Sequence, residues 1–459
     1  MIQFPGYEDC IKRVYNYRQE HVFAFWEDLD DAGRRLLLND LAEIDFDLLA
    51  RLYAAREAAA ETDYEPAPVI GLPSTEEDRV ERERARRAGE DRIRAGKVAA
   101  FVVAGGQGSR LGYEGPKGKF PIGPVSGKSL FQIHCEKVKR ACRVYHTRIP
   151  YLVMTSQANH NETVSFFREH QWFGLNEGDV YIFPQNMIPS LDMNGKLILE
   201  TTTGVFKNPD GHGGSLTALR TSGVLDELKA RGIDIISYYQ VDNPLVRIID
   251  PVFIGFHHLR GAEASSKAVA KAYPEEKVGV FVRYPNGSTS VIEYSDLPQE
   301  KARERDAEGR LLYWAGSIAI HLFDRSFVER ITSGEGASLP YHTAVKTIRG
   351  MTKEGVRETQ GLKFEKFVFD ALPLTDRNVV FETLREEEFA PVKNPAGIDS
   401  VESARAMMDA QARRWLLSRG IAVPTSVKVI EISPLVAAGP EDIDAGLVIP
   451  DRERVYIEA

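Results

Sequence analysis

The chain changes character at the stretch Val98-Ala-Ala-Phe-Val-Val-Ala104, an all-apolar run that glycines follow directly. A continuous apolar run of this length is typical of a strand that is buried on both faces of a parallel sheet. Further along the chain, strand-like runs alternate with segments of helical periodicity. The strands are predicted at residues 151–155, 180–183 and 233–241, and the helices at residues 130–145, 161–170 and 215–231. This alternation predicts an α/β fold with a mixed, mostly parallel sheet.

The region before this stretch has a different pattern. Glycine is scarce there, and apolar residues such as Leu37, Leu41, Ile44 and Leu48 recur at helical spacing. Residues 75–97 are rich in Glu, Arg and Ala with interleaved charges, as is typical of a solvated helix. We therefore predict a helical N-terminal region over residues 1–97.

The region after the central strands is predicted to be more varied. Strand-like runs crowd together at residues 267–272, 278–284 and 288–294, which indicates a partly antiparallel insertion over one edge of the sheet. A helix near residues 403–418 and short strand-like runs at 426–432 and 447–449 suggest a small C-terminal domain. A chain of 459 residues exceeds the size at which single cores stop growing. We therefore predict a catalytic domain over residues 98–380 and a C-terminal domain over 381–459.

The composition narrows the class of protein. Hydrophobic residues make up 43% of the chain and charged residues 27%, which is ordinary for a globular protein and excludes disordered and membrane-spanning classes. The formal charge of -9 argues against nucleic acid as a partner. Three cysteines without metal-ligand spacing predict neither a disulfide framework nor a metal cluster. Without a signal peptide or an apolar span, we expect a cytoplasmic protein with no membrane partner.

The glycines after the first strand predict a phosphate site. Gly105, Gly106, Gly108 and Gly112 would let backbone N–H groups approach an anion closely, and Arg110 and Lys117 add positive charge. The spacing does not fit two familiar motifs. Residues 106–112 are one residue too long for the dinucleotide fingerprint, and residues 123–129 are one residue too short for a P-loop. A nicotinamide cofactor and Walker-type ATP hydrolysis are therefore disfavoured.

The glycine loop resembles the signature of a known family. Ala104-Gly-Gly-Gln-Gly-Ser-Arg-Leu-Gly112, followed by Pro116-Lys-Gly-Lys-Phe-Pro-Ile-Gly123, is similar to the UDP-N-acetylhexosamine pyrophosphorylases of the UDP-glucose pyrophosphorylase superfamily. The resemblance continues to about residue 395 through Pro209-Asp-Gly-His-Gly-Gly214, Val241-Asp-Asn243 and Leu384-Arg-Glu-Glu-Glu-Phe-Ala-Pro-Val-Lys-Asn394. It implies a Rossmann-like nucleotidyltransferase fold and the reaction of UTP with a sugar 1-phosphate to give a UDP-sugar and pyrophosphate.

The resemblance also implies roles for particular residues. Asp242, which closes an apolar strand, would hold Mg²⁺, and Arg110, Lys117, Lys363 and Lys393 would neutralise phosphate oxygens. Gly105, Gly106, Gly108, Gln185 and Gly211 would contact the nucleotide, with the amide of Gln185 offering the donor and the acceptor that uracil requires. The sugar would be bound by His212, Asn243, Gly279, Glu293 and Ser317.

Two departures bear on the sugar. His212 and Ser317 stand where N-acetylhexosamine enzymes usually have asparagine, and His212 resembles the Gly-His-Gly stretch of UDP-glucose and broad UDP-sugar enzymes. The sugar phosphate is therefore expected to be N-acetylglucosamine 1-phosphate or glucose 1-phosphate. Two alternatives stay open: a UDP-glucose or broad UDP-sugar pyrophosphorylase, and a UDP-sugar-binding protein without turnover. The charged set of Arg110, Lys117, Asp242, Lys363 and Lys393 favours catalysis over binding alone.

Overall fold

The computed structural model describes residues 1–55, 63–334 and 339–458. The chain divides into two compact units. The first consists of residues 1–62, 185–217 and 339–370, and the second of residues 63–184, 218–338 and 371–459. The boundaries at 97/98 and 380/381 that the sequence suggested stay a prediction.

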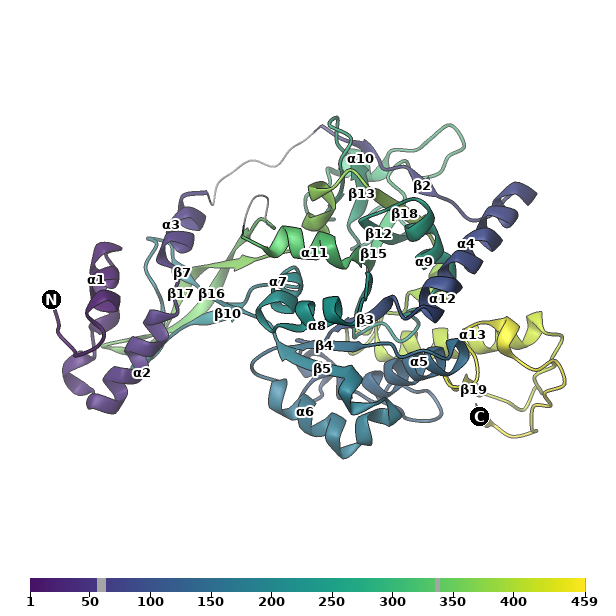
Figure 1. The fold of residues 1–459 in the computed structure, drawn as a ribbon, viewed down its shortest axis with the longest axis horizontal. Coiled ribbons are helices and arrows are strands. Elements are labelled where there is room, and N and C mark those ends of the chain that lie inside the picture. Colours follow the sequence, from purple (N-terminus) through teal and green to yellow (C-terminus); the bar gives the residue numbers. More distant parts are fainter. Residues whose placement is uncertain (56–62, 335–338, 459) are drawn as a thin grey trace. The chain divides into compact units, whose positions relative to one another are not determined.

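The second unit contains the large mixed sheet, drawn in Figure 1. Its main path runs β2-β18-β12-β15-β11-β3-β4-β5, and β13, β14 and β1 branch from it at β15. Strands β11, β3, β4 and β5 are parallel to one another, whereas β15 runs antiparallel to both of its neighbours, β11 and β12. The strands are β1 (Glu65–Pro66), β2 (Val69–Ile70), β3 (Val98–Val103), β4 (Tyr151–Thr155), β5 (Val180–Pro184), β11 (Ile235–Gln240), β12 (Ala264–Ala270), β13 (Val280–Arg283), β14 (Thr289–Ile292), β15 (Ala315–Asp324) and β18 (Asn378–Glu382). The predicted mixed, mostly parallel α/β fold is confirmed.

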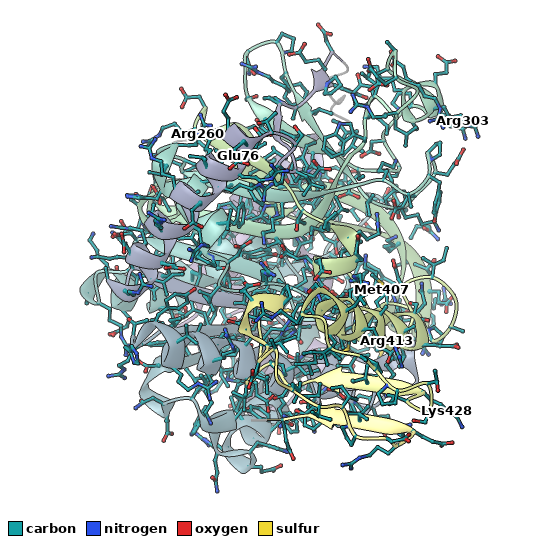
Figure 2. All side chains as sticks on the ribbon, turned by 90° about the vertical axis from the view of Figure 1, so that its right-hand side faces the viewer. Glu76, Arg260, Arg303, Met407, Arg413 and Lys428 are labelled. Atoms are coloured by element: carbon teal, nitrogen blue, oxygen red, sulfur yellow. The ribbon has the colours of Figure 1, made fainter. Side chains whose placement is uncertain are left out.

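Helices connect and cover these strands. They are α4 (Glu76–Arg94), α5 (Leu130–Tyr145), α6 (His160–Glu169), α8 (Val224–Ala230), α9 (Pro251–Leu259), α10 (Gln299–Arg303), α11 (Arg325–Thr332) and α12 (Arg385–Glu388). Helix α4 lies along α9 (Figure 1), and Figure 2 shows Glu76 of α4 near Arg260, so the two helices are antiparallel. They touch at Gly89, where a Cβ atom would lie 1.8 Å from the carbonyl oxygen of Pro251. This contact requires glycine.

The end of the chain forms a small layer of its own within the second unit. Helix α13 (Val401–Ser418) packs on β19 (Val429–Ile432), which pairs in parallel with β20 (Arg454–Ile457). Figure 2 shows Met407 and Arg413 on this helix and Lys428 just before β19. The apolar core between them includes Leu416, Ile430 and Val455.

The first unit combines the predicted N-terminal helices with strands from the middle of the chain. The helices are α1 (Glu8–Asn16), α2 (Asp31–Ala42) and α3 (Phe46–Ala55), and the strands are β6 (Met187–Pro189), β7 (Leu191–Asp192), β8 (Leu199–Thr201), β9 (Gly204–Val205), β10 (Lys207–Pro209), β16 (His342–Thr352) and β17 (Gly355–Glu365). Leu37, Leu38 and Leu41 of α2 share one core with Ile188 and Phe364. The N-terminal helices therefore fold against strands that are distant in sequence.

Three local predictions need correction. The helix predicted at 215–231 is two helices, α7 (Gly214–Thr221) and α8, because Gly223 takes a φ of +76° between them. Residues 447–449 form no strand, and β20 is the partner of β19 instead. The run predicted at 267–272 is β12, which lies within the main sheet between β15 and β18 rather than in an edge insertion.

Candidate active site

The glycine loop, residues 104–117, leaves β3 at the edge of the sheet where the parallel strands end. Two backbone hydrogen bonds close it: the Gly108 amide donates to Gly115 over 2.9 Å, and the Lys117 amide donates to Gly106 over 3.0 Å. Gly106 is exposed at the tip, whereas Gly108 is buried. The loop therefore has a fixed shape and an exposed backbone at residues 106 and 107, as a phosphate cradle requires.

Gly105 and Arg110 lie on either side of the exposed residues 106 and 107 of the loop. Arg110 is exposed in the short 3₁₀ helix Ser109–Leu111, and its guanidinium has no hydrogen-bond or ion-pair partner within the described ranges. Gly105 is half-buried, next to Ala104, whose carbonyl oxygen accepts a hydrogen bond from Asn159 over 3.1 Å. Arg110 thus offers a guanidinium that could bind two anion oxygens at once.

The structure brings Lys117 and Asp242 together. The Lys117 ammonium lies 3.4 Å from a carboxylate oxygen of Asp242, and each side chain is 15% exposed. Asp242 follows β11 closely, and Lys117 begins the short helix Lys117–Lys119. The two predicted charged residues therefore form one half-buried ion pair at the carboxyl end of the sheet, where open α/β sheets bind ligands.

Asn243, the next residue, is buried and its amide is occupied within the fold. Its Nδ2 donates to the carbonyl oxygen of Glu388 over 2.6 Å, and its Oδ1 accepts from the amides of Leu245 and Ala390. The predicted sugar contact of Asn243 stays a prediction. The observed bonds give this residue a part in holding the turn after Asp242.

Three predicted sugar-binding residues lie next to one another. The Ser317 amide donates to the carbonyl oxygen of Gly279 over 2.8 Å, and a Cβ on Gly279 would lie 3.5 Å from a carboxylate oxygen of Glu293. Ser317 lies near the start of β15, which is antiparallel to β11 with His321 opposite Tyr238. Continuing this register places Ser317 at the same end of the sheet as Asp242.

Lys393 is half-buried near Asp399. The Lys393 amide donates to the carbonyl oxygen of Asp399 over 2.7 Å. Burial raises the pKa of the Asp399 carboxyl; the nearby charge of Lys393 opposes this, and that of Asp242 adds to it. The charges of Lys393 and Asp242 thus both act on the Asp399 carboxyl, which nothing in the local sequence pattern marks.

Four predicted residues form a separate group within the first unit. Gln185 is buried just before β6, and Gly211 lies just after β10, the antiparallel partner of β6. The two residues are therefore at the same end of that strand pair. Gly211 has a φ of +85°, and a Cβ there would lie 2.4 Å from the carbonyl oxygen of Lys366, so this close approach requires glycine.

His212 is built into the same loop. Its Nδ1 accepts a hydrogen bond from the Val368 amide over 3.2 Å, and its ring stacks on Phe367. Burial lowers the pKa of His212 to about 4, although Asp370 and Glu365 act against this. The ring is therefore neutral near pH 7, with its proton on Nε2.

Lys363 lies on β17 in the same unit, paired with Glu365 at 2.6 Å. Asp210, in the motif at residues 209–214, was not predicted as a site residue from the sequence. Asp210 is 2% exposed, its Oδ1 has no hydrogen-bond partner among the residues that the structure describes, and burial raises its pKa to about 6. The Asp210 carbonyl oxygen accepts from the Lys366 amide over 2.8 Å, so the loop at 209–214 is bound to residues 366–368.

The second unit also contains a cavity of about 650 Å³. It is lined by residues of α4, α5 and α13, by the segment 244–252 and by the C-terminal layer. None of the predicted site residues lines it. Within the described residues, no helix is long and apolar enough to cross a membrane.

A mixed α/β sheet with a closed glycine loop and a lysine–aspartate pair at its carboxyl edge defines a nucleotide-binding α/β protein. The family model described as UTP–glucose-1-phosphate uridylyltransferase matches residues 65–441. The chain belongs to this family, and the resemblance on which the sequence analysis relied is confirmed.

Individual relatives agree with the family match. The chain is 37% identical to UDP-N-acetylglucosamine diphosphorylase 2 of Arabidopsis thaliana, over 96% of this chain and 91% of that one. It is 36% identical to UDP-N-acetylhexosamine pyrophosphorylase-like protein 1 of Homo sapiens, over 96% and 94% of the two chains. The crystal structure of the uridine diphosphate N-acetylglucosamine pyrophosphorylase from Trypanosoma brucei, in complex with an inhibitor, matches with a TM-score of 0.86 and 28% identity, covering 100% of this chain and 99% of that chain.

Proposed function

We propose that this protein uses N-acetylglucosamine 1-phosphate, and also accepts glucose 1-phosphate. The chain is a uridylyltransferase that forms a UDP-sugar from UTP and a sugar 1-phosphate. The first sugar is the one named in the relatives from Arabidopsis thaliana and Saccharomyces cerevisiae. The wider tolerance is inferred from His212 and Ser317, because neither residue offers the amide that could bind an acetamido group.

The observation that carries the catalytic proposal is the Lys117–Asp242 pair beside the glycine loop. A phosphate oxygen of the sugar 1-phosphate attacks the α-phosphorus of UTP. The bond from that phosphorus to the leaving pyrophosphate oxygen breaks, so no protein nucleophile is needed. Arg110 and Lys117 neutralise the pyrophosphate, and Lys393 neutralises a phosphate oxygen of the reacting group. Lys363 keeps the phosphate-neutralising role that the family resemblance implies. The protein contributes position and charge.

Asp242 is the predicted site residue whose oxygen donors suit Mg²⁺. The Asp242 carboxylate is half-buried and next to the predicted phosphate loop, and hard oxygen ligands are what Mg²⁺ prefers. No group of three or more His, Cys, Asp or Glu side chains that could hold a metal occurs in the described part of the chain. We therefore propose that Asp242 holds the ion together with the substrates' own phosphates. When bound, the ion would supply charge neutralisation at the α-phosphate.

Initial rates with a panel of sugar 1-phosphates test the substrate proposal. UTP is held constant while N-acetylglucosamine, N-acetylgalactosamine, glucose and galactose 1-phosphates are varied, and kcat/KM is compared. We expect turnover with both N-acetylglucosamine 1-phosphate and glucose 1-phosphate. Strict selectivity for N-acetylated sugars would contradict the role given to His212 and Ser317, while turnover with none would contradict the function itself. We place the reaction in the cytoplasm.

A further inference from the structure

A buried cluster of three charged side chains lies outside the predicted site. Lys267 on β12 is fully buried, and its ammonium donates to an Asp250 oxygen over 2.6 Å and to both oxygens of Glu388 over 2.6 and 2.7 Å. Asp250 precedes α9, and Glu388 ends α12. We refer to Lys267, Asp250 and Glu388 as the buried triad.

The carboxylates of the triad are bound on their other sides as well. The second oxygen of Asp250 accepts the amides of Val252 and Phe253 at the start of α9. Glu388 accepts from the Thr383 hydroxyl over 2.7 Å and from the Arg247 amide over 3.2 Å. The triad thus ties β12 to two separate segments, residues 247–253 before and at the start of α9 and residues 383–388 that include α12.

Stability alone is a weak reason for such a cluster. Removing three charges from water is costly, and buried ion pairs are often replaceable by apolar residues of similar volume without loss of stability. The best-attested benefit of a buried ionic group is that it selects one arrangement of the segments around it. The relevant question is therefore which arrangement the triad selects.

The segments held by the triad lead directly to two residues of the proposed site. The Glu388 carbonyl oxygen accepts the Asn243 amide group over 2.6 Å, and Asn243 in turn accepts the Ala390 amide over 3.1 Å. The Val392 amide donates to the carbonyl oxygen of Asp242 over 2.9 Å. Three hydrogen bonds therefore join the Asp242–Asn243 turn to residues 388–392, immediately before Lys393.

We propose that the buried triad is a positioning device for the uridylyl transfer: by fixing Glu388, it fixes the Asp242 carboxylate relative to the Lys393 ammonium. The triad itself does not touch substrate. This inference rests on the proposed roles of Asp242 and Lys393. It makes Lys267, Asp250 and Glu388 positioning residues that act through the turn after β11.

The test replaces the triad by neutral side chains of similar volume. The variant Lys267→Met/Asp250→Asn/Glu388→Gln removes all three charges while keeping an asparagine, a favourable N-cap, at the start of α9. Glu388→Gln alone is a milder second variant that decides the question if the triple variant does not fold. Glu263→Gln is the matched control. Glu263 is also a buried carboxylate next to β12, but it forms an ion pair with Arg330 over 2.7 Å and lies away from the proposed site.

We expect the triad variants to lower kcat by roughly tenfold to a hundredfold, as a misplacement of about 1 Å does, with KM for UTP nearly unchanged. Glu263→Gln is expected to lower the unfolding temperature and leave kcat unchanged. A folded triad variant with the kcat of the unmodified protein would overturn the proposal.

Amide hydrogen exchange gives a readout that does not depend on activity. We expect faster exchange in peptides covering residues 240–248 and 388–394 of the triad variants, and unchanged exchange in β16 and β17. Unchanged exchange in both peptides would overturn the positioning role even if activity fell. An unmodified protein without uridylyltransferase activity would instead contradict the proposed function, and the exchange result would still decide whether the triad holds the turn.

Discussion

At the scale of single residues, the proposed chemistry depends on charged side chains that bind phosphate and a metal ion. Asp242 and Lys117 form an ion pair only 3.4 Å apart, although 125 positions separate them in the chain. Each had been assigned its own role from the sequence. The structure places both charges in one ion pair at the carboxyl end of the sheet.

Asp242→Ala should remove nearly all turnover, because the proposed metal ligand is lost. The fold should be retained with a lower unfolding temperature, because removing one partner of a largely buried ion pair leaves the Lys117 ammonium without its counter-charge. Steady-state rates and thermal unfolding check the two statements separately. Turnover equal to that of the unmodified protein would remove Asp242 from the mechanism.

Lys117→Ala should lower kcat/KM for pyrophosphate in the reverse reaction by roughly tenfold to a hundredfold, the size expected for one charge-assisted contact to phosphate. Lys119→Ala is the matched control. Lys119 belongs to the same short helix but pairs with Glu162 at 2.7 Å. Equal effects of the two substitutions would argue against a specific role for Lys117.

At the scale of elements, the loop at 209–214 and the helix pair α4–α9 show what local patterns could and could not predict. The motif at residues 209–214 predicted a nucleotide contact for Gly211, which stays a prediction, whereas the structure shows Gly211 close to the backbone of Lys366. The partner segment could not be predicted, because residues 366–368 are about 150 positions away in sequence. The same holds for α4, whose charged composition predicted a helix but not the contact of Gly89 with Pro251.

Acidic pH should destabilise the folded protein through the buried His212 in the loop at residues 209–214. The pKa of His212 is lowered to about 4 in the folded protein, so its neutral form contributes stability that is fully present above pH 6.5 and is lost as pH falls toward 4. We expect His212→Asn to flatten this part of the pH dependence of unfolding. Identical profiles for the two proteins between pH 4 and 6.5 would contradict the burial of the ring.

Asp210, in the same loop, should have the opposite effect on how the free energy of unfolding depends on pH. Its pKa is raised to about 6, so the folded protein binds this proton more tightly than the unfolded chain does, and the stabilising contribution falls as pH rises from about 4 to 6. Asp210→Asn should therefore increase the unfolding temperature at pH 8 relative to the unmodified protein. A lower unfolding temperature at pH 8 would show that the charged carboxylate is stabilised by a favourable partner in the folded protein.

Gly89→Ala should destabilise the protein without changing the chemistry. The added methyl group would clash with the Pro251 carbonyl, and such overpacking typically costs about 1–3 kcal/mol. Arg84→Ala, at an exposed position of the same helix, should cost little. Chemical denaturation measures both, and an unchanged midpoint for Gly89→Ala would mean that α4 and α9 can separate easily.

At the scale of the whole molecule, the sequence predicted what is local and missed what joins distant segments. The central strands and α5 were predicted almost to the residue, because a buried parallel strand and an amphipathic helix each leave a strong local pattern. The long hairpin of β16 and β17 was missed, since much of it is exposed and lacks a clean alternation. The buried triad was missed because Lys267 and Glu388 are 121 positions apart.

The candidate site likewise contains residues that a local sequence pattern marks and residues that only the folded structure brings to attention. The glycine loop is contiguous, so its closed shape after β3 could be predicted from the spacing of its glycines, and its proposed role in binding phosphate rests on the same pattern. Asp399 and Asp210 could not be singled out, because their environments come from burial and from charges that are distant in sequence. Family resemblance supplied Lys363 and Lys393, which local chemistry would have taken for ordinary surface lysines.

The central claim is that this chain joins UTP to a sugar 1-phosphate with release of pyrophosphate. Mass-spectrometric detection of the products from UTP, N-acetylglucosamine 1-phosphate and Mg²⁺ tests it most directly, with the Asp242→Ala variant measured in parallel. We expect equal amounts of UDP-N-acetylglucosamine and pyrophosphate from the unmodified protein and almost none of either from the variant. The contradicting result is a protein that binds a UDP-sugar but releases no pyrophosphate with either N-acetylglucosamine 1-phosphate or glucose 1-phosphate. That result would indicate a UDP-sugar-binding protein without turnover.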